Sequence, residues 1–521
     1  MLIVPGRPGI EGLTWWIYSP DGIRPTQESL RLTAGSQVIA ATANEVAAVK
    51  VIHGLWRSGD PTIARNIFVV ATTGLRPDME YSLSSLSAVS SDAVTSRTLP
   101  PLSASKPITM GVGSCYGRVR GRNVDQWVKL KDIFNDRDNP IRFRFLCGDQ
   151  IYMDLDPATD DVVDGKPNSM LRYQSQWIQD VPFRRFLASS PTMTLADDHE
   201  FWNNYPDRID IPFSSKWKWA ENELGGPVGQ EFDRAFALFQ AGLNLDPRAV
   251  VDDTSVENRE KMDRLLRDDA RTFSIDLGFL NILALDVRTR RTSMSYDGSK
   301  PKVAVPHFDP QAAGLKGGVD SSRLPDVSWL EKVKDWLGNL QTPGVLILSQ
   351  PLVEKENAST YLGVRVEENL PEYKDDFALL WEAIFAAKYD VLIVSGDIHW
   401  SRLYHISNSR NHRNEVYEFI SSPLSRIVPS QADPETPSET TGTIEWKGTT
   451  PSAGSVSGRA IWNRYSDDAA TDALNIYGTL TFTARGTIPA NYVEVTASLW
   501  PPFVPFKSIR QIKPFLLKAG K

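Results

Sequence analysis

The sequence has few cysteines and no long apolar run. Its two cysteines, Cys115 and Cys147, are too few for a disulfide framework. No stretch approaches the roughly 18 consecutive apolar residues that mark a transmembrane helix. Residues 1–8 lack the basic segment and the following apolar segment of a signal peptide. We therefore expect no membrane span, and a location in the cytoplasm or, for a mature form whose leader has been removed, outside it.

The chain also has little excess charge of either sign. Its net charge of −7 and its pI near 5.6 argue against a general affinity for nucleic acids or anionic membranes. Apolar residues make up 41% and charged residues 23%, as in ordinary globular proteins. With 521 residues the chain exceeds the roughly 250–300 at which one core stops growing. We expect two or more domains or one elaborated domain, in an oligomeric state that composition leaves open.

Residues 1–100 have the pattern of an all-β domain. Short apolar runs at 37–41, 49–53 and 66–72 are separated by Gly, Pro and Ser, without helical periodicity. Residues 73–77, Thr-Gly-Leu-Arg-Pro, and then Tyr81 resemble the end of a fibronectin type III or Ig-like β-sandwich. In such sandwiches the leucine packs inward and the tyrosine makes the corner hydrogen bond. The paired prolines at 100–101 then predict a linker.

From residue 107 to residue 521 the sequence pattern predicts alternating strands and helices. Strands are predicted at 108–113, 141–147, 192–196, 345–350 and 391–395, and helices at 124–134, 170–187, 328–340 and 377–387. Strands at 473–484 and 492–499 are expected to complete a sheet. This alternation indicates an α/β core. Residues 206–260, rich in Trp, Gly and charge but without clear periodicity, suggest an insertion or lid over that core.

Acidic residues and histidines directly follow three of the predicted strands. Asp149 and Tyr152 follow strand 141–147, the run Asp197-Asp198-His199-Glu200 follows strand 192–196, and Asp397 and His399 follow strand 391–395. Ligand sites in open α/β sheets form at the carboxyl ends of strands. Burying several carboxylates together is costly unless a cation neutralises them. The pattern therefore predicts a metal site that suits Ca²⁺, Mn²⁺, Fe or Zn²⁺.

Each cluster taken alone has a simpler interpretation. A Gly-Asp pair after a strand is most often a turn or a helix N-cap. A single His399 is more often a hydrogen-bonded structural residue, and Asp-Asp-His-Glu is compatible with a solvated loop. The joint occurrence of all three clusters at strand ends, in this order, favours the metal site.

The ordered motifs carry a resemblance to a known family. They are Gly113-Ser114-Cys115, Gly148-Asp149-x-x-Tyr152-x-Asp154, Asp197-Asp198-His199-Glu200-x-x-Asn203-Asn204 and Ser395-Gly396-Asp397-Ile398-His399. This set resembles the PhoD-like alkaline phosphatases of the calcineurin-like metallophosphoesterase superfamily, over about residues 107–500. The resemblance implies a β-sandwich flanked by helices (α-β-β-α), preceded by a small all-β domain.

The resemblance also implies a dinuclear metal centre. Asp149 would bridge both metals. The first metal would be held by Asp149, Cys115, Tyr152 and His399. Because a phenolate and a thiolate would bind it, this metal is expected to be Fe³⁺. The second, bound by Asp198 and Asp397, would be Ca²⁺ because the site is rich in oxygen, with Zn²⁺ or Mn²⁺ as alternatives. The superfamily usually supplies a further histidine near 345–350, where this chain has Ser349 and Gln350, so that Gln350 replaces the ligand or the ligand is missing.

Three further residues receive roles from the resemblance. His199 would protonate the leaving oxygen. Arg288 would face the substrate phosphate, for which a guanidinium fork is suited, although a strand-end surface arginine is the simpler interpretation. Asn203 would bind metal or phosphate. The remaining histidines have no motif context and are interpreted as structural or surface residues: His53, His307, His405 and His412.

The predicted function is hydrolysis of a small-molecule phosphate ester by water activated at two metals. One alternative keeps this centre but acts on bulky lipid, teichoic-acid-like or nucleotide diesters, as a phosphodiesterase with phospholipase D-like activity. In that case Trp217 and Trp219 would shape a pocket for the alcohol. A second alternative is a non-catalytic β-module that binds a surface or a carbohydrate.

Overall fold

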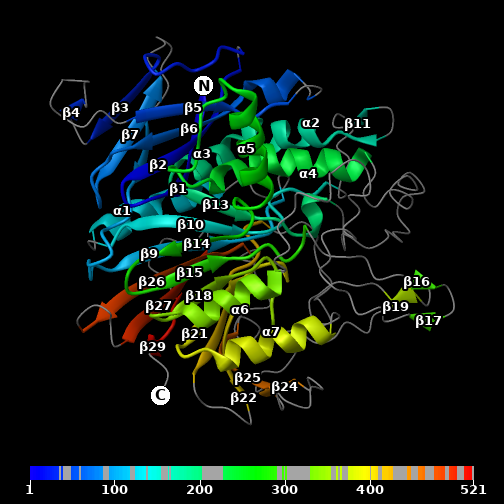
Figure 1. Cartoon of the computed structure of the whole chain (residues 1–521). Helices are drawn as coiled ribbons and strands as arrows, with labels where there is room; N and C mark the ends of the chain where they lie inside the picture. Colours follow the sequence, from blue (N-terminus) through cyan, green and yellow to red (C-terminus); the bar gives the residue numbers. More distant parts are fainter. Residues whose placement is uncertain are drawn as a thin grey trace.

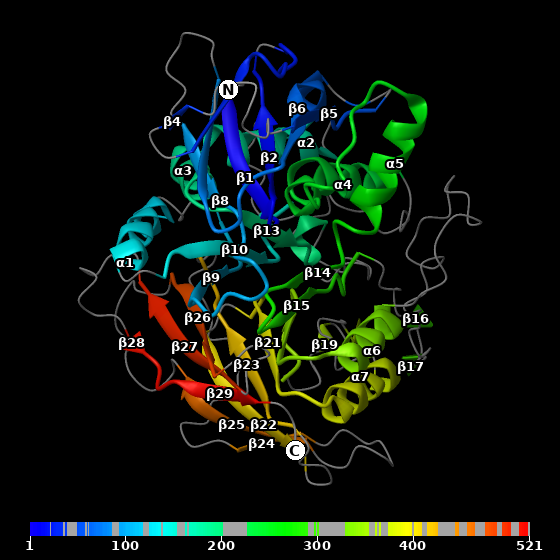
Figure 2. The ribbon, with the colours of Figure 1, turned by 60° about the vertical axis from the view of Figure 1, so that its left-hand side comes forward.

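The computed structural model describes most of the chain (Figure 1). The described residues are 1–20, 22–34, 37–38, 49–57, 60, 62–85, 93–117, 124–136, 139–153, 162–163, 166–201, 227–289, 296–297, 300–301, 329–353, 360–361, 364–365, 374–398, 401–408, 414–425, 443–446, 456–463, 475–486, 492–501 and 510–518. The two termini lie toward opposite ends of the molecule (Figures 1 and 2). Within the described residues, no helix has both the length and the apolar character needed to cross a bilayer.

The N-terminal strands form two antiparallel sheets. One has the order β1 (Leu2–Pro8), β2 (Gly12–Tyr18), β6 (Ile67–Thr73) and β5 (Val49–Gly54). The other has the order β4 (Gln37–Val38), β3 (Leu30–Ala34), β7 (Glu80–Ser85) and β8 (Val94–Arg97). Alternate residues of both sheets, including Trp15, Phe68 and Leu83, share one hydrophobic core.

The end of this sandwich matches the expectation for a fibronectin- or Ig-like module. Leu75 is buried in the sandwich core. The Tyr81 hydroxyl accepts a hydrogen bond from the backbone N–H of Arg76 at 2.9 Å, which is the corner interaction of such sandwiches. The all-β N-terminal fold is therefore confirmed, while a domain boundary near residue 100 stays a prediction.

Two larger sheets face each other in the centre of the molecule. Among the described residues, the first has the order β13 (Thr192–Leu195), β10 (Ile141–Cys147), β9 (Ile108–Gly113), β26 (Tyr477–Arg485), β27 (Tyr492–Trp500) and β28 (Arg510–Gln511), with β29 (Phe515–Lys518) also paired to β27. The second has the order β14 (Phe273–Asp276), β15 (Asn281–Ala284), β18 (Gly344–Ile347), β21 (Val391–Ser395), β23 (Val416–Ile420), β22 (Arg402–Asn408), β25 (Val456–Asn463) and β24 (Thr443–Trp446).

The alternation of side chains along each strand explains the layers. Phe143 and Phe145 of β10 face the core between the two sheets, whereas Leu146 faces the helices outside. On β21, Leu392 points into the same inter-sheet core and Ile393 points to the opposite side. β10 and β21 therefore bury side chains on both faces, as their near-continuous apolar runs require.

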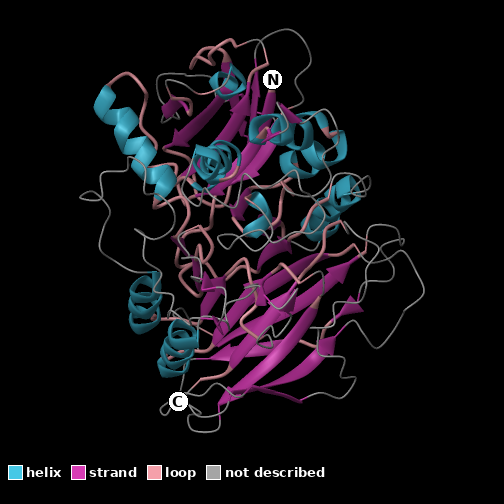
Figure 3. Cartoon of the chain, turned by 90° about the vertical axis from the view of Figure 1, so that its right-hand side faces the viewer, coloured by secondary structure: helices cyan, strands magenta, loops and turns pink. Residues whose placement is uncertain are grey.

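Helices cover the outer faces of the two sheets (Figure 3). The first sheet is covered by the 3₁₀ helix Val124–Lys129, α1 (Leu130–Asp136), α2 (Ser169–Tyr173), the π-helical segment Gln174–Gln179 and α3 (Val181–Ala188). The second is covered by α6 (Trp329–Asn339) and α7 (Lys374–Ala386). The four-layered α-β-β-α arrangement expected from the sequence is confirmed.

The described part of the predicted insertion packs against the core. Residues 227–260 contribute α4 (Pro227–Phe239) and the start of α5 (Val256–Arg267). Phe232, Phe236 and Phe239 of α4 belong to the core that joins the N-terminal sandwich to the first sheet. The Trp16 indole donates to the carbonyl of Leu238 at 2.8 Å, and its ring packs against Phe239. The insertion or lid around residues 206–260 stays a prediction. Residues 206–226 lie outside the described residues.

Candidate metal centre

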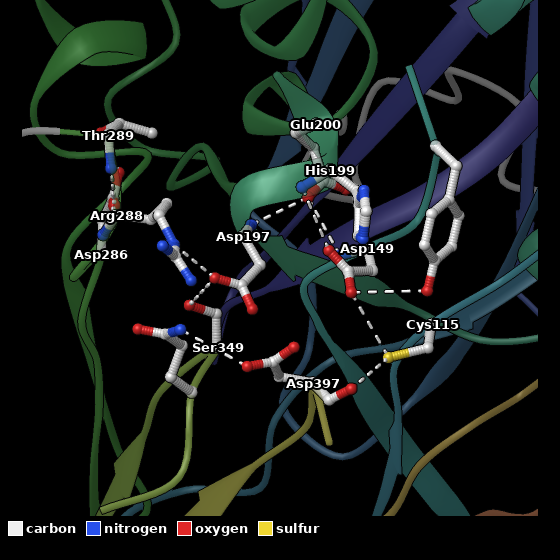
Figure 4. A network of polar contacts seen from close by, with 12 residues as sticks. Cys115, Asp149, Asp197, His199, Glu200, Asp286, Arg288, Thr289, Ser349 and Asp397 are labelled. Atoms are coloured by element: carbon white, nitrogen blue, oxygen red, sulfur yellow. Dashed lines mark hydrogen bonds and ion pairs between the residues drawn. The ribbon is translucent and has the colours of Figure 1, made fainter. Parts of the chain in front are cut away.

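The candidate site lies where the carboxyl ends of parallel strands from both central sheets meet (Figure 4). Cys115 follows β9, Asp149 follows β10, Asp197 follows β13 and Asp397 follows β21. These strands are parallel to their neighbours β10, β13 or β18, so their ends point to the same edge. Four sequence-distant loops are thereby brought to one place.

The backbone turns sharply at three of these residues. Cys115, Asp149 and Asp397 have φ angles of 59°, 55° and 67°, and among the described residues only Asp78 is a further non-glycine with positive φ. A left-handed conformation costs an L-residue roughly 1–2 kcal/mol, and such residues concentrate at functional sites. Gly148 before Asp149 also has positive φ, and a Cβ there would lie 2.4 Å from the Cβ of Asp197. Close packing of two loops therefore requires glycine at this position.

Four carboxylates gather at this edge. One oxygen each of Asp149, Asp197, Asp198 and Asp397 lies within 4.8 Å of the others, and Asp149, Asp198 and His199 form a second set at the same spacing. The Asp149, Asp197 and Asp397 side chains point toward one another (Figure 4). Burial, together with the nearby Cys115 and the other carboxylates, raises the pKa of Asp149 well above its ordinary value. Because so many negative charges are stable together only with a counter-charge, this donor set fits a bound cation.

Cys115 and Tyr152 adjoin this group of carboxylates. The Cys115 thiol lies 3.5 Å from Asp149 Oδ2 and 3.3 Å from the backbone carbonyl of Asp397, and it accepts from the Ser422 hydroxyl at 3.2 Å. The Tyr152 hydroxyl donates to Asp149 Oδ2 at 3.4 Å. Burial raises the pKa of Cys115 to about 12 and raises that of Tyr152 as well. Both groups are therefore protonated at neutral pH unless a cation displaces the proton.

His199 lies beside the carboxylates and against Tyr152. Its backbone N–H donates to Asp149 Oδ1 at 3.4 Å. Its ring packs against the Tyr152 ring, with centroids 4.3 Å apart and the ring planes tilted by 40°. The ring is thus held beside the group of carboxylates.

Glu200 is buried completely and lies behind the ligand-bearing loops. It accepts hydrogen bonds from the backbone N–H groups of Asp149, Gln150 and Asp197 and from the side chain of Gln240. Burial raises the pKa of Glu200 to about 7, and these four hydrogen bonds oppose the rise.

Arg288 reaches the group through Asp197. Its Nε donates to Asp197 Oδ1 at 2.6 Å, and the Ser349 hydroxyl donates to the same oxygen at 3.3 Å. The Arg288 loop is shaped by the Asp286 carboxylate, which accepts from the backbone N–H groups of Arg288 and Thr289. Since Arg288 and Asp197 are 1% and 0% exposed, Arg288 is not the surface arginine of the simpler interpretation.

Gln350 contacts the Asp397 side chain. Its amide donates to Asp397 Oδ2 at 3.4 Å. Gln350 therefore lies next to a predicted ligand.

Other predicted residues fall away from the site or outside the described residues. His53 is buried and bonds the carbonyl of Val251, and His405 pairs with Glu415, as expected for structural or surface residues. The following predicted or discussed residues lie outside the described residues: His399, Asn203, His307, His412, Trp217 and Trp219.

The structure thus brings together five of the predicted metal ligands, namely Cys115, Asp149, Tyr152, Asp198 and Asp397, with their roles still predictions. Sequence reasoning placed Asp197 and Glu200 at this strand end but gave neither of them a role. Both stand in the Asp-Asp-His-Glu run, which was a usable signal. The contact between Gln240 and Glu200 could not be predicted, because nothing in the sequence around Gln240 indicates a buried polar contact.

The sequence matches no protein-family model and no curated protein. The fold is similar to a solved structure of PhoD, with a TM-score of 0.56 and 14% identity over 98% of this chain and 91% of that chain. A structure of purple acid phosphatase PPD1 from yellow lupin (Lupinus luteus) seeds is similar with a TM-score of 0.48 and 13% identity, over 99% of this chain and 73% of that chain. At 14% identity, the similarity to the PhoD structure shows the fold alone.

Proposed function

We propose that this chain is a metallophosphoesterase of the alkaline phosphatase type, which hydrolyses small-molecule phosphate esters. The observation that carries the proposal is the group of Asp149, Asp197, Asp198 and Asp397 at the carboxyl ends of the central strands, in a fold similar to that of PhoD. Buried carboxylates at this spacing are suited to divalent or trivalent cations. Phosphoryl transfer in turn needs mainly positioning and charge neutralisation, which such cations supply.

The residues present fit two metals. Asp149 lies between the Cys115–Tyr152 side and the carboxylate side of the group and is suited to bridge them. We assign Fe³⁺ to the side with the phenol and thiol, together with His399, and Ca²⁺ to the oxygen-rich side with Asp198 and Asp397. Two such cations, if bound, would supply a water of lowered pKa and positive charge for the phosphate oxygens.

The chain's own side chains supply the remaining steps. His199, held against Tyr152, gives a proton to the leaving oxygen so that an alcohol departs. Arg288, whose Nε is held by Asp197, offers a planar guanidinium that suits a phosphate oxygen. Orientation of both groups before the substrate arrives lowers the cost of positioning it.

The test is metal analysis and hydrolysis by protein purified without chelator, using 4-nitrophenyl phosphate and bis(4-nitrophenyl) phosphate. We expect two metals per chain and faster hydrolysis of the monoester. Asp149→Ala should lose both metal and activity, because both cations lose their shared ligand. The matched control, Asp276→Ala, removes an exposed carboxylate at the opposite end of the sheet and should retain both.

The two alternatives give different results in the same test. Faster hydrolysis of the diester would identify a phosphodiesterase with the same centre. Metal-free wild-type protein without activity would favour the non-catalytic β-module. Normal metal content and turnover in Asp149→Ala would refute the proposed centre.

A further inference from the structure

The Glu200 carboxylate joins two loops that are far apart in the sequence. Its Oε2 accepts from the backbone N–H groups of Asp149 at 2.9 Å and of Asp197 at 2.8 Å. Its Oε1 accepts from the backbone N–H of Gln150 at 2.7 Å and from the Gln240 amide at 2.9 Å. The loop after β10 and the loop after β13 are thus held by one buried side chain.

These two loops carry much of the proposed metal centre. The first contributes Asp149 and Tyr152, and the second contributes Asp198 and His199. Glu200 directly follows His199, so the carboxylate is itself anchored in the second loop and reaches across to the first. In the first loop it holds Asp149, whose backbone has the left-handed conformation that an L-residue adopts only when its surroundings impose it.

We propose that Glu200 is a positioning residue that sets the separation of the Asp149 and Asp198 carboxylates and thereby the affinity of the centre for metal. The inference rests on the proposed function, because it concerns the same site. Glu200 would bind neither the substrate nor a metal. It would act through the backbone of the two loops that carry Asp149 and Asp198. Residues that orient metal ligands typically change metal affinity by about 10–100-fold when they are replaced.

The chemistry of the four donors explains why a carboxylate is needed. A carboxylate offers acceptor sites on both oxygens, and all four partners of Glu200 are N–H donors. In Glu200→Gln one oxygen becomes an NH₂ group, which then faces two N–H donors in either orientation of the amide. At least two of the four hydrogen bonds are lost without a change in side-chain size.

Asp390 provides a matched control. It is a buried carboxylate that accepts two backbone N–H bonds, from Glu415 at 2.8 Å and Lys518 at 2.7 Å. It precedes β21, whereas Asp397 follows this strand, and five strand residues span about 16 Å. Asp390→Asn therefore removes the same kind of contact at the opposite end of the sheet.

The experiment measures binding of Mn²⁺ alone to chelator-treated protein by calorimetry, together with the melting temperature of the metal-free form and kcat for 4-nitrophenyl phosphate. For Glu200→Gln we expect Mn²⁺ binding to weaken about 10–100-fold and kcat to remain low at saturating Mn²⁺. For Asp390→Asn we expect a lower melting temperature with Mn²⁺ affinity within about twofold of wild type.

A second variant keeps the test decisive if Glu200→Gln does not fold. Gln240→Met removes one of the four hydrogen bonds and leaves the three backbone contacts, so Mn²⁺ binding should weaken by a few-fold only. Wild-type affinity in Glu200→Gln or, where that variant does not fold, in Gln240→Met would overturn the inference. So would an equal loss of affinity in Asp390→Asn. If wild-type protein itself binds no metal and hydrolyses no ester, the proposed function fails instead.

Discussion

The pair formed by Arg288 and Asp197 gives the sharpest test of the electrostatics of this site. Both side chains are almost fully buried, and Nε lies 2.6 Å from Oδ1. Arg288→Met keeps much of the side-chain length but leaves Asp197 without this counter-charge, beside three other carboxylates. Removing one partner of a buried ion pair typically costs about 3–5 kcal/mol, which is roughly a 10²–10⁴-fold change in the ratio of folded to unfolded protein. Replacing both partners with neutral groups costs much less.

The assay is a double-mutant cycle on chelator-treated protein, with the free energy of unfolding from urea titration. We expect Arg288→Met to lose about 3–5 kcal/mol in the wild-type background and little in the Asp197→Asn background. Adding Mn²⁺ should reduce the loss in the wild-type background, because a bound cation then compensates the Asp197 charge. Equal losses in the two backgrounds would show that the pair is not coupled, and the electrostatic account of Arg288 would be refuted.

Three other perturbations have defined outcomes. His199→Ala should retain metal but lose about 10²–10⁴-fold in the rate of hydrolysis. The loss should be larger for alkyl phosphates than for 4-nitrophenyl phosphate, because the nitrophenol leaving group needs little protonation. Equal losses for the two substrates would exclude His199 as the proton donor. Iron-containing protein should show a visible absorption band from charge transfer between the Tyr152 phenolate and the metal, which Zn²⁺ cannot produce. Tyr152→Phe should shift or erase this band. Active, iron-replete protein without the band would exclude Tyr152 as a ligand. Burial lowers the pKa of His53 below its ordinary value of 6.5, so the unfolded chain binds more protons and the protein loses stability as pH falls below about 6.5. His53→Asn keeps a donor for the Val251 carbonyl but cannot titrate, so urea unfolding at pH 7.5 and 5.5 should show a smaller loss than in wild type.

Several elements could be predicted from the sequence because their signals are local. The strands Ile108–Gly113, Ile141–Cys147 and Val391–Ser395 begin and end where predicted, since each is an apolar run closed by a polar residue or a glycine turn. The meeting of Asp149 and Asp198 also followed from the sequence, because the parallel neighbours β10 and β13 place their carboxyl ends at one edge, whereas Asp397 reaches them from the second sheet. The Tyr81 corner was predictable for the same reason, as its partner Arg76 is only five residues away.

The contacts that organise the site depended on the tertiary structure. Helix α4 was not recognised, although its buried side chains join the N-terminal sandwich to the first central sheet. Arg288 and Asp197 are 91 residues apart, and Gln240 lies 40 residues from Glu200. Such partners are selected by the register of neighbouring strands, in which a shift of one residue moves every side chain to the other face. Local sequence specifies which residues can ionise, donate or accept, but only the packing of the two sheets determines which of them meet.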